Sequence, residues 1–129
     1  MGIDVYLSWD GQTDIEKKAQ ITGYSVGMGH VGYLREAYHG EPYATKELFG
    51  WFWNEEQPEN GYKVSSFDLM RRLPAALEAS AKRHREKYNE NGNPDKPEKS
   101  YFLKSFVDFV TLHKRLEVEE RNPRIIISR

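Results

Sequence analysis

Two segments at opposite ends of the chain have the residue pattern of β-strands, and this pair constrains the fold most. Apolar and polar residues alternate over residues 3–10, which is typical of a strand buried on one face. The apolar side of this strand is formed by Ile3, Val5, Leu7 and Trp9. Residues 125–128 form a second short run rich in β-branched side chains. Because unpaired strand edges are unfavourable, we expect the two segments to pair with each other.

Between these strands, apolar residues recur at helical spacing in four segments, the first of which is residues 31–39. Segment 43–53 predicts a short helix with Leu48, Phe49, Phe52 and Trp53 on one face. Residues 65–88 predict a long helix capped by Ser65 and Asp68, with Pro74 inside it. Its expected apolar stripe consists of Phe67, Met70, Pro74, Leu77, Ala81, His84 and Tyr88. Residues 101–119 predict the most buried helix, centred on Phe102, Phe106, Phe109, His113 and Leu116.

These elements together predict a helix-rich α+β fold with a small sheet. A chain of 129 residues is long enough for one hydrophobic core, so we expect a single domain over residues 1–129. Residues 20–26 are a candidate third strand. The polar segment 89–100 has no apolar residues and is expected to be a flexible loop.

Charge and composition exclude several partner classes. The formal net charge is −1, so no overall field attracts nucleic acid or an anionic membrane, and we expect neither as a partner. The chain has no cysteine, which removes disulfides, thiolate nucleophiles and cysteine-based zinc sites. The first residues include Asp4 and no long apolar run, so we expect neither a signal peptide nor a membrane span. By default, this pattern indicates a cytoplasmic protein.

The segment 23–40 is rich in glycine and contains a motif that resembles a dinucleotide-binding turn. Gly27, Gly29 and Gly32 have the G-x-G-x-x-G spacing, and the residues 31–39 that follow have a helical pattern. However, a dinucleotide-binding fold needs further βαβ units, which the rest of the chain lacks. The glycines therefore favour either a plain turn or a loop that holds a small anion at the start of a helix.

The same segment supplies the candidate site. In the expected helix 31–39, the polar face carries Arg35, Glu36 and His39. The candidate ligand-binding residues are Asp4, His30, Tyr33, Arg35, Glu36, His39 and Tyr43. Glu36 and His39 also form a Glu-x-x-His pair, but one pair provides only two metal ligands and a stable site needs at least three. We therefore expect no metal and no other cofactor.

These residues leave two hypotheses about function. The first is a binding or interaction module whose site recognises a small anionic ligand or a protein partner. The alternative is a small metal-independent hydrolase or transferase, with His30, Glu36 and His39 as candidate catalytic residues. No nucleophile motif supports the alternative. His84 and His113 lie in apolar stripes and are expected to be core or boundary residues.

An aromatic segment offers a possible surface for self-association. Residues 49–53, from Phe49 to Trp53, contain four aromatic rings. Such rings usually lie in a core, but an exposed Trp51 would be a candidate anchor for a protein partner. A homodimer formed through this segment is compatible with either hypothesis.

Overall fold

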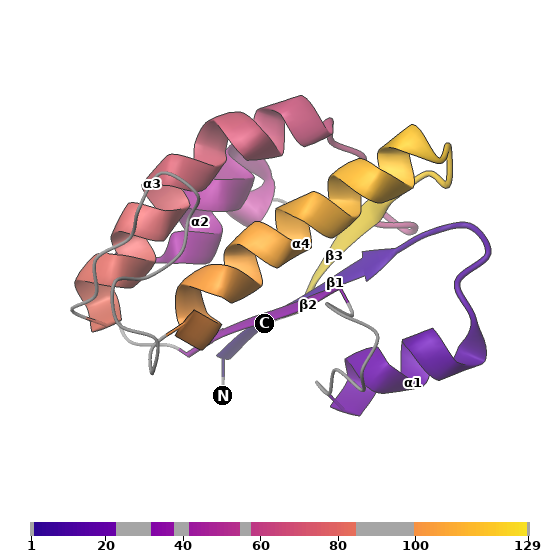
Figure 1. Cartoon of the computed structure of the whole chain (residues 1–129), viewed down its shortest axis with the longest axis horizontal. Helices are drawn as coiled ribbons and strands as arrows, with labels where there is room; N and C mark the ends of the chain where they lie inside the picture. Colours follow the sequence, from indigo (N-terminus) through magenta and orange to yellow (C-terminus); the bar gives the residue numbers. More distant parts are fainter. Residues whose placement is uncertain (1, 23–31, 38–41, 55–57, 85–99, 129) are drawn as a thin grey trace.

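The computed structural model describes residues 2–22, 32–37, 42–54, 58–84 and 100–128. Within them it shows an α+β fold in which three strands form one antiparallel sheet in the order β2-β1-β3 (Figure 1). The elements are β1 (Gly2–Ser8), α1 (Asp14–Thr22), β2 (Tyr33–Ala37), α2 (Ala44–Phe49), the 3₁₀ helix η1 (Gly50–Asn54), α3 (Ser66–His84), α4 (Ser100–Val118) and β3 (Arg124–Ser128). The predicted fold class is confirmed.

The first and last strands pair as the sequence predicts. β1 is the central strand, and Tyr6 lies opposite Ile126 of β3 and Tyr33 of β2. The alternation of β1 is also confirmed, because Ile3, Val5 and Leu7 are fully buried. The N-terminal strand therefore connects both edge strands and forms the middle of the core surface.

The predicted helix over residues 31–39 is wrong, because β2 occupies residues 33–37. Leu34 is 2% exposed and faces the core, whereas Arg35 beside it is exposed, as strand alternation requires. This short segment has only one strongly buried apolar position, so its sequence fits the helical period as well as the strand period. The backbone hydrogen bonds that β1 offers on this side decide in favour of a strand. The proposed third strand over residues 20–26 is also wrong at its start, because Gln20 belongs to α1.

The turn before β2 explains what Gly32 does. Its φ of +81° lies in the left-handed region that favours glycine, and a Cβ there would lie 2.9 Å from the Gln20 amide nitrogen and 3.0 Å from Leu7 Cβ. Gln20 Nε2 donates to the carbonyl oxygens of Leu7 at 2.7 Å and Gly32 at 3.2 Å, which attaches α1 to the sheet. Because a strand and not a helix follows Gly32, the helix N-terminus needed by the dinucleotide motif is missing.

Helices α2, α3 and α4 cover one face of the sheet, while α1 lies apart from them beyond one end of the sheet (Figure 1). The predicted centre line of α4 is confirmed where its side chains are described: Phe106, Phe109, His113 and Leu116 are all buried. Phe109 meets the ring of Phe49 from α2, edge to face, with centroids 6.0 Å apart. The core therefore lies between the sheet and these three helices.

The long helix α3 exists as predicted, but the first half of its expected apolar stripe is wrong. Phe67 is 73% and Met70 is 45% exposed, whereas Leu69, Ala76 and Leu77 are buried. The helix packs against both α2 and α4, and these two contacts set its rotation about its own axis. The expected cap is present, since the Asp68 backbone N–H donates to Ser65 Oγ at 3.1 Å. The expected flexible loop 89–100 lies outside the described residues except for its last residue, which begins α4.

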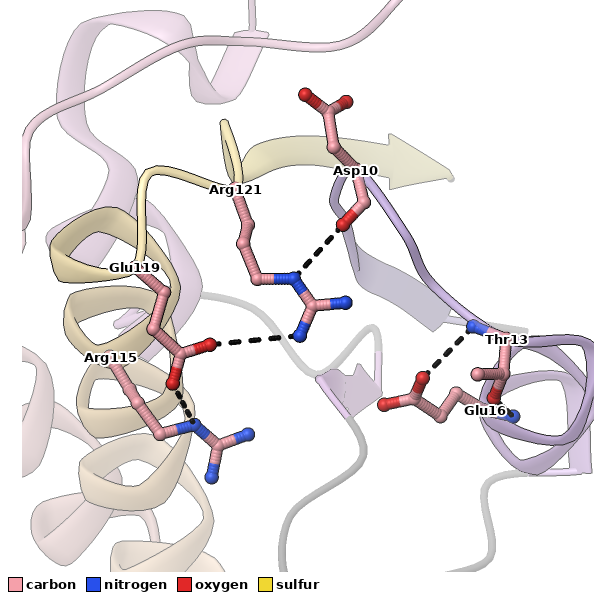
Figure 2. A network of polar contacts seen from close by, with 6 residues as sticks. All are labelled: Asp10, Thr13, Glu16, Arg115, Glu119 and Arg121. Carbon is pink, nitrogen blue, oxygen red and sulfur yellow. Dashed lines mark hydrogen bonds and ion pairs between the residues drawn. The ribbon is translucent and has the colours of Figure 1, made fainter.

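Polar contacts hold the chain reversal after β1 against the segment before β3 (Figure 2). Arg121 Nε donates to the carbonyl oxygen of Asp10 at 3.0 Å, and Arg121 Nη1 lies 3.6 Å from a Glu119 carboxylate oxygen. Beyond this turn, Thr13 and Glu16 form a complete capping box at the start of α1, with hydrogen bonds of 2.9 and 3.1 Å. These contacts fix where β1 ends and where α1 begins.

Candidate functional site

Several candidate site residues lie on the face of the sheet that is turned away from Leu34 and the core. Helices α2, α3 and α4 cover the other face (Figure 1). The register places Asp4 directly opposite Arg35, and Tyr6 directly opposite Tyr33. Residues that face each other across an antiparallel pair share one side of the sheet, so these four side chains lie together. Three of them, Asp4, Tyr33 and Arg35, were predicted as site residues. Tyr6 was not, although the alternation of β1 places it on the same face as Asp4.

A single carboxylate oxygen of Asp4 binds both Tyr33 and Arg35. Asp4 Oδ1 accepts a hydrogen bond from the Tyr33 hydroxyl at 2.6 Å and another from Arg35 Nη1 at 2.8 Å. The Tyr6 and Tyr33 rings lie next to each other, with centroids 5.2 Å apart and planes inclined by 32°. The Arg35 side chain is 48% exposed and that of Asp4 is 22% exposed. The guanidinium is thus held in a fixed place and can still be reached from solvent.

The protonation states follow from these contacts. Burial, followed by the hydrogen bond to Asp4, raises the pKa of Tyr33 to about 12, although Arg35 acts in the opposite direction. The hydrogen bond to Asp4 also raises the pKa of Arg35. At neutral pH, Tyr33 is therefore a neutral hydrogen-bond donor and Arg35 is a cation. Neither group can exchange a proton readily, which suits binding better than acid–base catalysis.

The Tyr33 phenol gives a measurable test of this network. We expect one tyrosine to ionise near pH 12 in an absorbance titration, and Tyr33→Phe to remove that late step. Asp4→Asn should lower the pKa of Tyr33, because it removes a negative charge and leaves Arg35 nearby. Since the raised pKa favours the neutral phenol in the folded state, its contribution to stability is lost as the pH rises from 10 to about 12. A tyrosine titration unchanged by both variants would contradict the network.

Glu36 lies on the other side of the sheet and has a structural role. Its carboxylate accepts hydrogen bonds from the backbone N–H groups of Ala44 at 2.8 Å and Thr45 at 2.9 Å, and from the Thr45 hydroxyl at 2.6 Å. Both oxygens therefore cap the N-terminus of α2. The expectation that Arg35 and Glu36 share one face is wrong, because neighbouring residues of a strand point to opposite faces.

The other predicted site residues are separated from the outer face or lie outside the described residues. Tyr43 immediately precedes α2 and packs against the core, with its ring centroid 5.5 Å from that of Trp53. His30 and His39 lie outside the described residues. The described part of the chain contains no group of three metal-binding side chains. The proposed Glu36 and His39 pair assumed that both residues lie on one helix, whereas Glu36 belongs to a strand.

A buried Ser–His contact between α3 and α4 was missed by sequence reasoning. The hydroxyl oxygen of Ser66 lies 2.7 Å from Nδ1 of His113, and both residues are nearly or fully buried. His113 Nε2 has no hydrogen-bond partner in the described structure. Glu117 does not complete a catalytic triad, because its carboxylate accepts from the backbone N–H of Ser66 at 3.2 Å. The burial of His113 in its apolar stripe is as predicted, but nothing in the sequence pattern indicated Ser66 as its partner.

A groove of about 500 Å³ lies near the C-terminal end of α4. Its lining residues are Lys63, Val64, Glu117, Glu120, Asn122 and Pro123. It contains none of the predicted site residues, and Glu117 in its wall is already bonded to α3. The groove therefore does not extend the candidate site on the sheet.

Three of the four aromatic side chains in the segment proposed for a homodimer lie in the core. Phe49, Phe52 and Trp53 are between 1% and 9% exposed, so their rings form part of the core. Trp53 Nε1 also donates to the Thr45 hydroxyl at 3.0 Å inside the protein. Buried side chains cannot contact a second subunit, and the Trp51 side chain lies outside what the structure describes.

Comparison of the chain with protein-family models, with curated proteins and with solved structures finds no match. Among the described residues, no helix combines the length and the apolar composition needed to cross a membrane.

Proposed function

We propose that this protein is a binding module that recognises a protein partner or a small anionic ligand with the outer face of its sheet. The single observation that carries the proposal is the Asp4-centred contact of Tyr33 and Arg35. This contact holds a half-exposed guanidinium beside two tyrosine rings. Such preorganised groups lose little conformational entropy when a ligand binds.

The chemistry of the four side chains supports this choice. Asp4 uses one arm of the Arg35 guanidinium, whose remaining N–H groups can donate to a carboxylate or a phosphate. Tyr and Arg are also among the residues enriched at protein interfaces. Of the candidate catalytic residues of the alternative, a hydrolase or transferase, Glu36 is engaged at the N-terminus of α2, and His30 and His39 lie outside the described residues.

The test uses two kinds of probe. A random peptide library is selected against the immobilised protein, while inorganic phosphate and benzoate are titrated in parallel by amide NMR. We expect at least one probe to shift the resonances of β1 and β2. Arg35→Gln should weaken its binding about tenfold or more, the value of one charge-assisted hydrogen bond.

The matched control is Arg115→Gln, which changes another exposed, ion-paired arginine on the helix side of the molecule. This variant should bind like the wild-type protein. Resonance shifts confined to α3 and α4, or no binding of any probe, would overturn the proposal.

A further inference from the structure

The backbone of β2 has one edge that points away from β1, next to the proposed binding face. The N–H of Leu7 donates to the carbonyl oxygen of Gly32 at 2.8 Å, so alternate residues from Gly32 onward point their backbone groups toward β1. The intervening residues Tyr33, Arg35 and Ala37 must then point theirs away from β1. No strand among the described residues pairs with this side of β2.

The opposite edge of the sheet is formed by β3, and another segment of the chain pairs with part of it. Ile125 of β3 exchanges two backbone hydrogen bonds with Tyr62, at 2.8 and 2.9 Å, which covers part of that edge. The edge of β2 contains no proline and no lysine, the usual protection against strand pairing. Its one charged side chain on the outer face, Arg35, is drawn back over the sheet by Asp4. The β2 edge is therefore suited to accept another strand.

We infer that β2 binds an extended acidic peptide from a partner protein, which adds antiparallel to Tyr33, Arg35 and Ala37 as a fourth strand. This inference rests on the proposed function and specifies its ligand. Main-chain hydrogen bonds provide affinity in this mode, and alternate side chains provide specificity. A peptide carboxylate opposite Arg35 meets the guanidinium donors that Asp4 leaves unused, and an aromatic residue two positions later lies opposite Tyr33.

A peptide fits this edge better than a second copy of the chain. Stable protein interfaces bury about 800 Å² per partner, more than the edge of a strand of this length provides by itself. In addition, a symmetric pairing centred on Arg35 would place two guanidinium groups opposite each other, which is unfavourable. A single acidic strand avoids both difficulties.

The probe is the synthetic peptide acetyl-Thr-Val-Glu-Val-Tyr-Val-Thr-amide, in which Glu lies opposite Arg35 and Tyr lies opposite Tyr33. At saturation we expect hydrogen exchange of the Tyr33, Arg35 and Ala37 amides to slow about tenfold. Methylation of the Glu backbone nitrogen should weaken binding about tenfold, because that N–H points toward β2. Methylation of the following Val nitrogen is the matched control, since that N–H points away. Replacing Glu by Lys should also weaken binding.

A protein variant separates this inference from the proposed function. Ala37→Pro removes an outward N–H at the end of β2 and leaves Tyr33 and Arg35 unchanged, so it should reduce peptide binding but not the binding of benzoate or phosphate. If these anions bind but the peptide does not slow hydrogen exchange of the Tyr33, Arg35 and Ala37 amides, the inference is overturned and the proposed function stands. Equal effects of the two methylated peptides, or a free protein that sediments as a dimer through β2, would also overturn it. Failure of every probe would overturn both.

Discussion

Lowering the pH from 7 to 4 should reduce the free energy of unfolding by about 3 kcal/mol through His113 alone. Burial lowers the pKa of this imidazole from its ordinary value of 6.5 to about 4, although the charge of Glu117 acts in the opposite direction. Between these two pH values, the unfolded chain binds a proton that the folded protein does not. Stability is therefore complete above pH 6.5 and is lost progressively as the pH falls toward 4.

The structural reason is the position of the imidazole between α3 and α4. His113 is fully buried, Nδ1 lies 2.7 Å from the Ser66 hydroxyl oxygen, and Nε2 has no partner in the described structure. A second ring proton would add a buried positive charge without adding a hydrogen-bond acceptor at Nε2.

Urea unfolding at pH 7, 5.5 and 4 measures this effect. The control is His113→Leu, which keeps an apolar side chain in the site but cannot titrate. Acidic residues titrate in both proteins, so the difference between the two pH profiles isolates His113. We expect the wild-type protein to lose about 3 kcal/mol more than the variant between pH 7 and pH 4. Parallel profiles would show that the imidazole has an ordinary pKa.

Replacing Glu36 by alanine should lower the free energy of unfolding by about 3 kcal/mol, because it removes three hydrogen bonds to a charged group at once. The carboxylate satisfies two backbone N–H groups at the start of α2 and the hydroxyl of Thr45. That hydroxyl in turn accepts from Trp53 Nε1, so the loss extends into the core. Glu36→Gln should cost less, since one acceptor oxygen remains.

The matched control is Glu47→Ala, which removes an exposed acid from α2 itself and should change stability by no more than about 0.5 kcal/mol. Thermal or urea unfolding of the three variants provides the comparison. If Glu36→Ala were as stable as Glu47→Ala, the capping role of Glu36 would be wrong, and the carboxylate would again be available for the catalytic role considered from the sequence.

Much of the fold could be predicted, because its main elements have strong periodicity. The alternation of β1 and the spacing of Phe106, Phe109 and Leu116 in α4 predict both elements with the correct buried face. The segment that became β2 could not be predicted in this way. It is short, and its pattern fits a helix as well as a strand, so the hydrogen bonds that β1 offers decided its conformation. The rotation of α3 was likewise set by its neighbours, which left Phe67 on the surface.

The candidate site was predicted in part. Asp4, Tyr33 and Arg35 were expected in one site, and the structure brings them into contact. Glu36 was placed with them because a helix was assumed, and correcting the helix to a strand moves this residue to the opposite face. That these residues bind a ligand stays a prediction.

The sequence by itself determined the class of fold, the location of the two terminal strands and the burial of His113, because each of these depends on local periodicity and side-chain polarity. The pairing of the two strands followed from the general rule that strand edges need partners. Only the tertiary structure decided that β2 is a strand, that Glu36 caps α2, and that Ser66 meets His113. These features join residues far apart in the chain or depend on hydrogen bonds offered by a neighbouring element. A local sequence pattern contains no information about contacts between distant residues or about the hydrogen bonds that a neighbouring element offers.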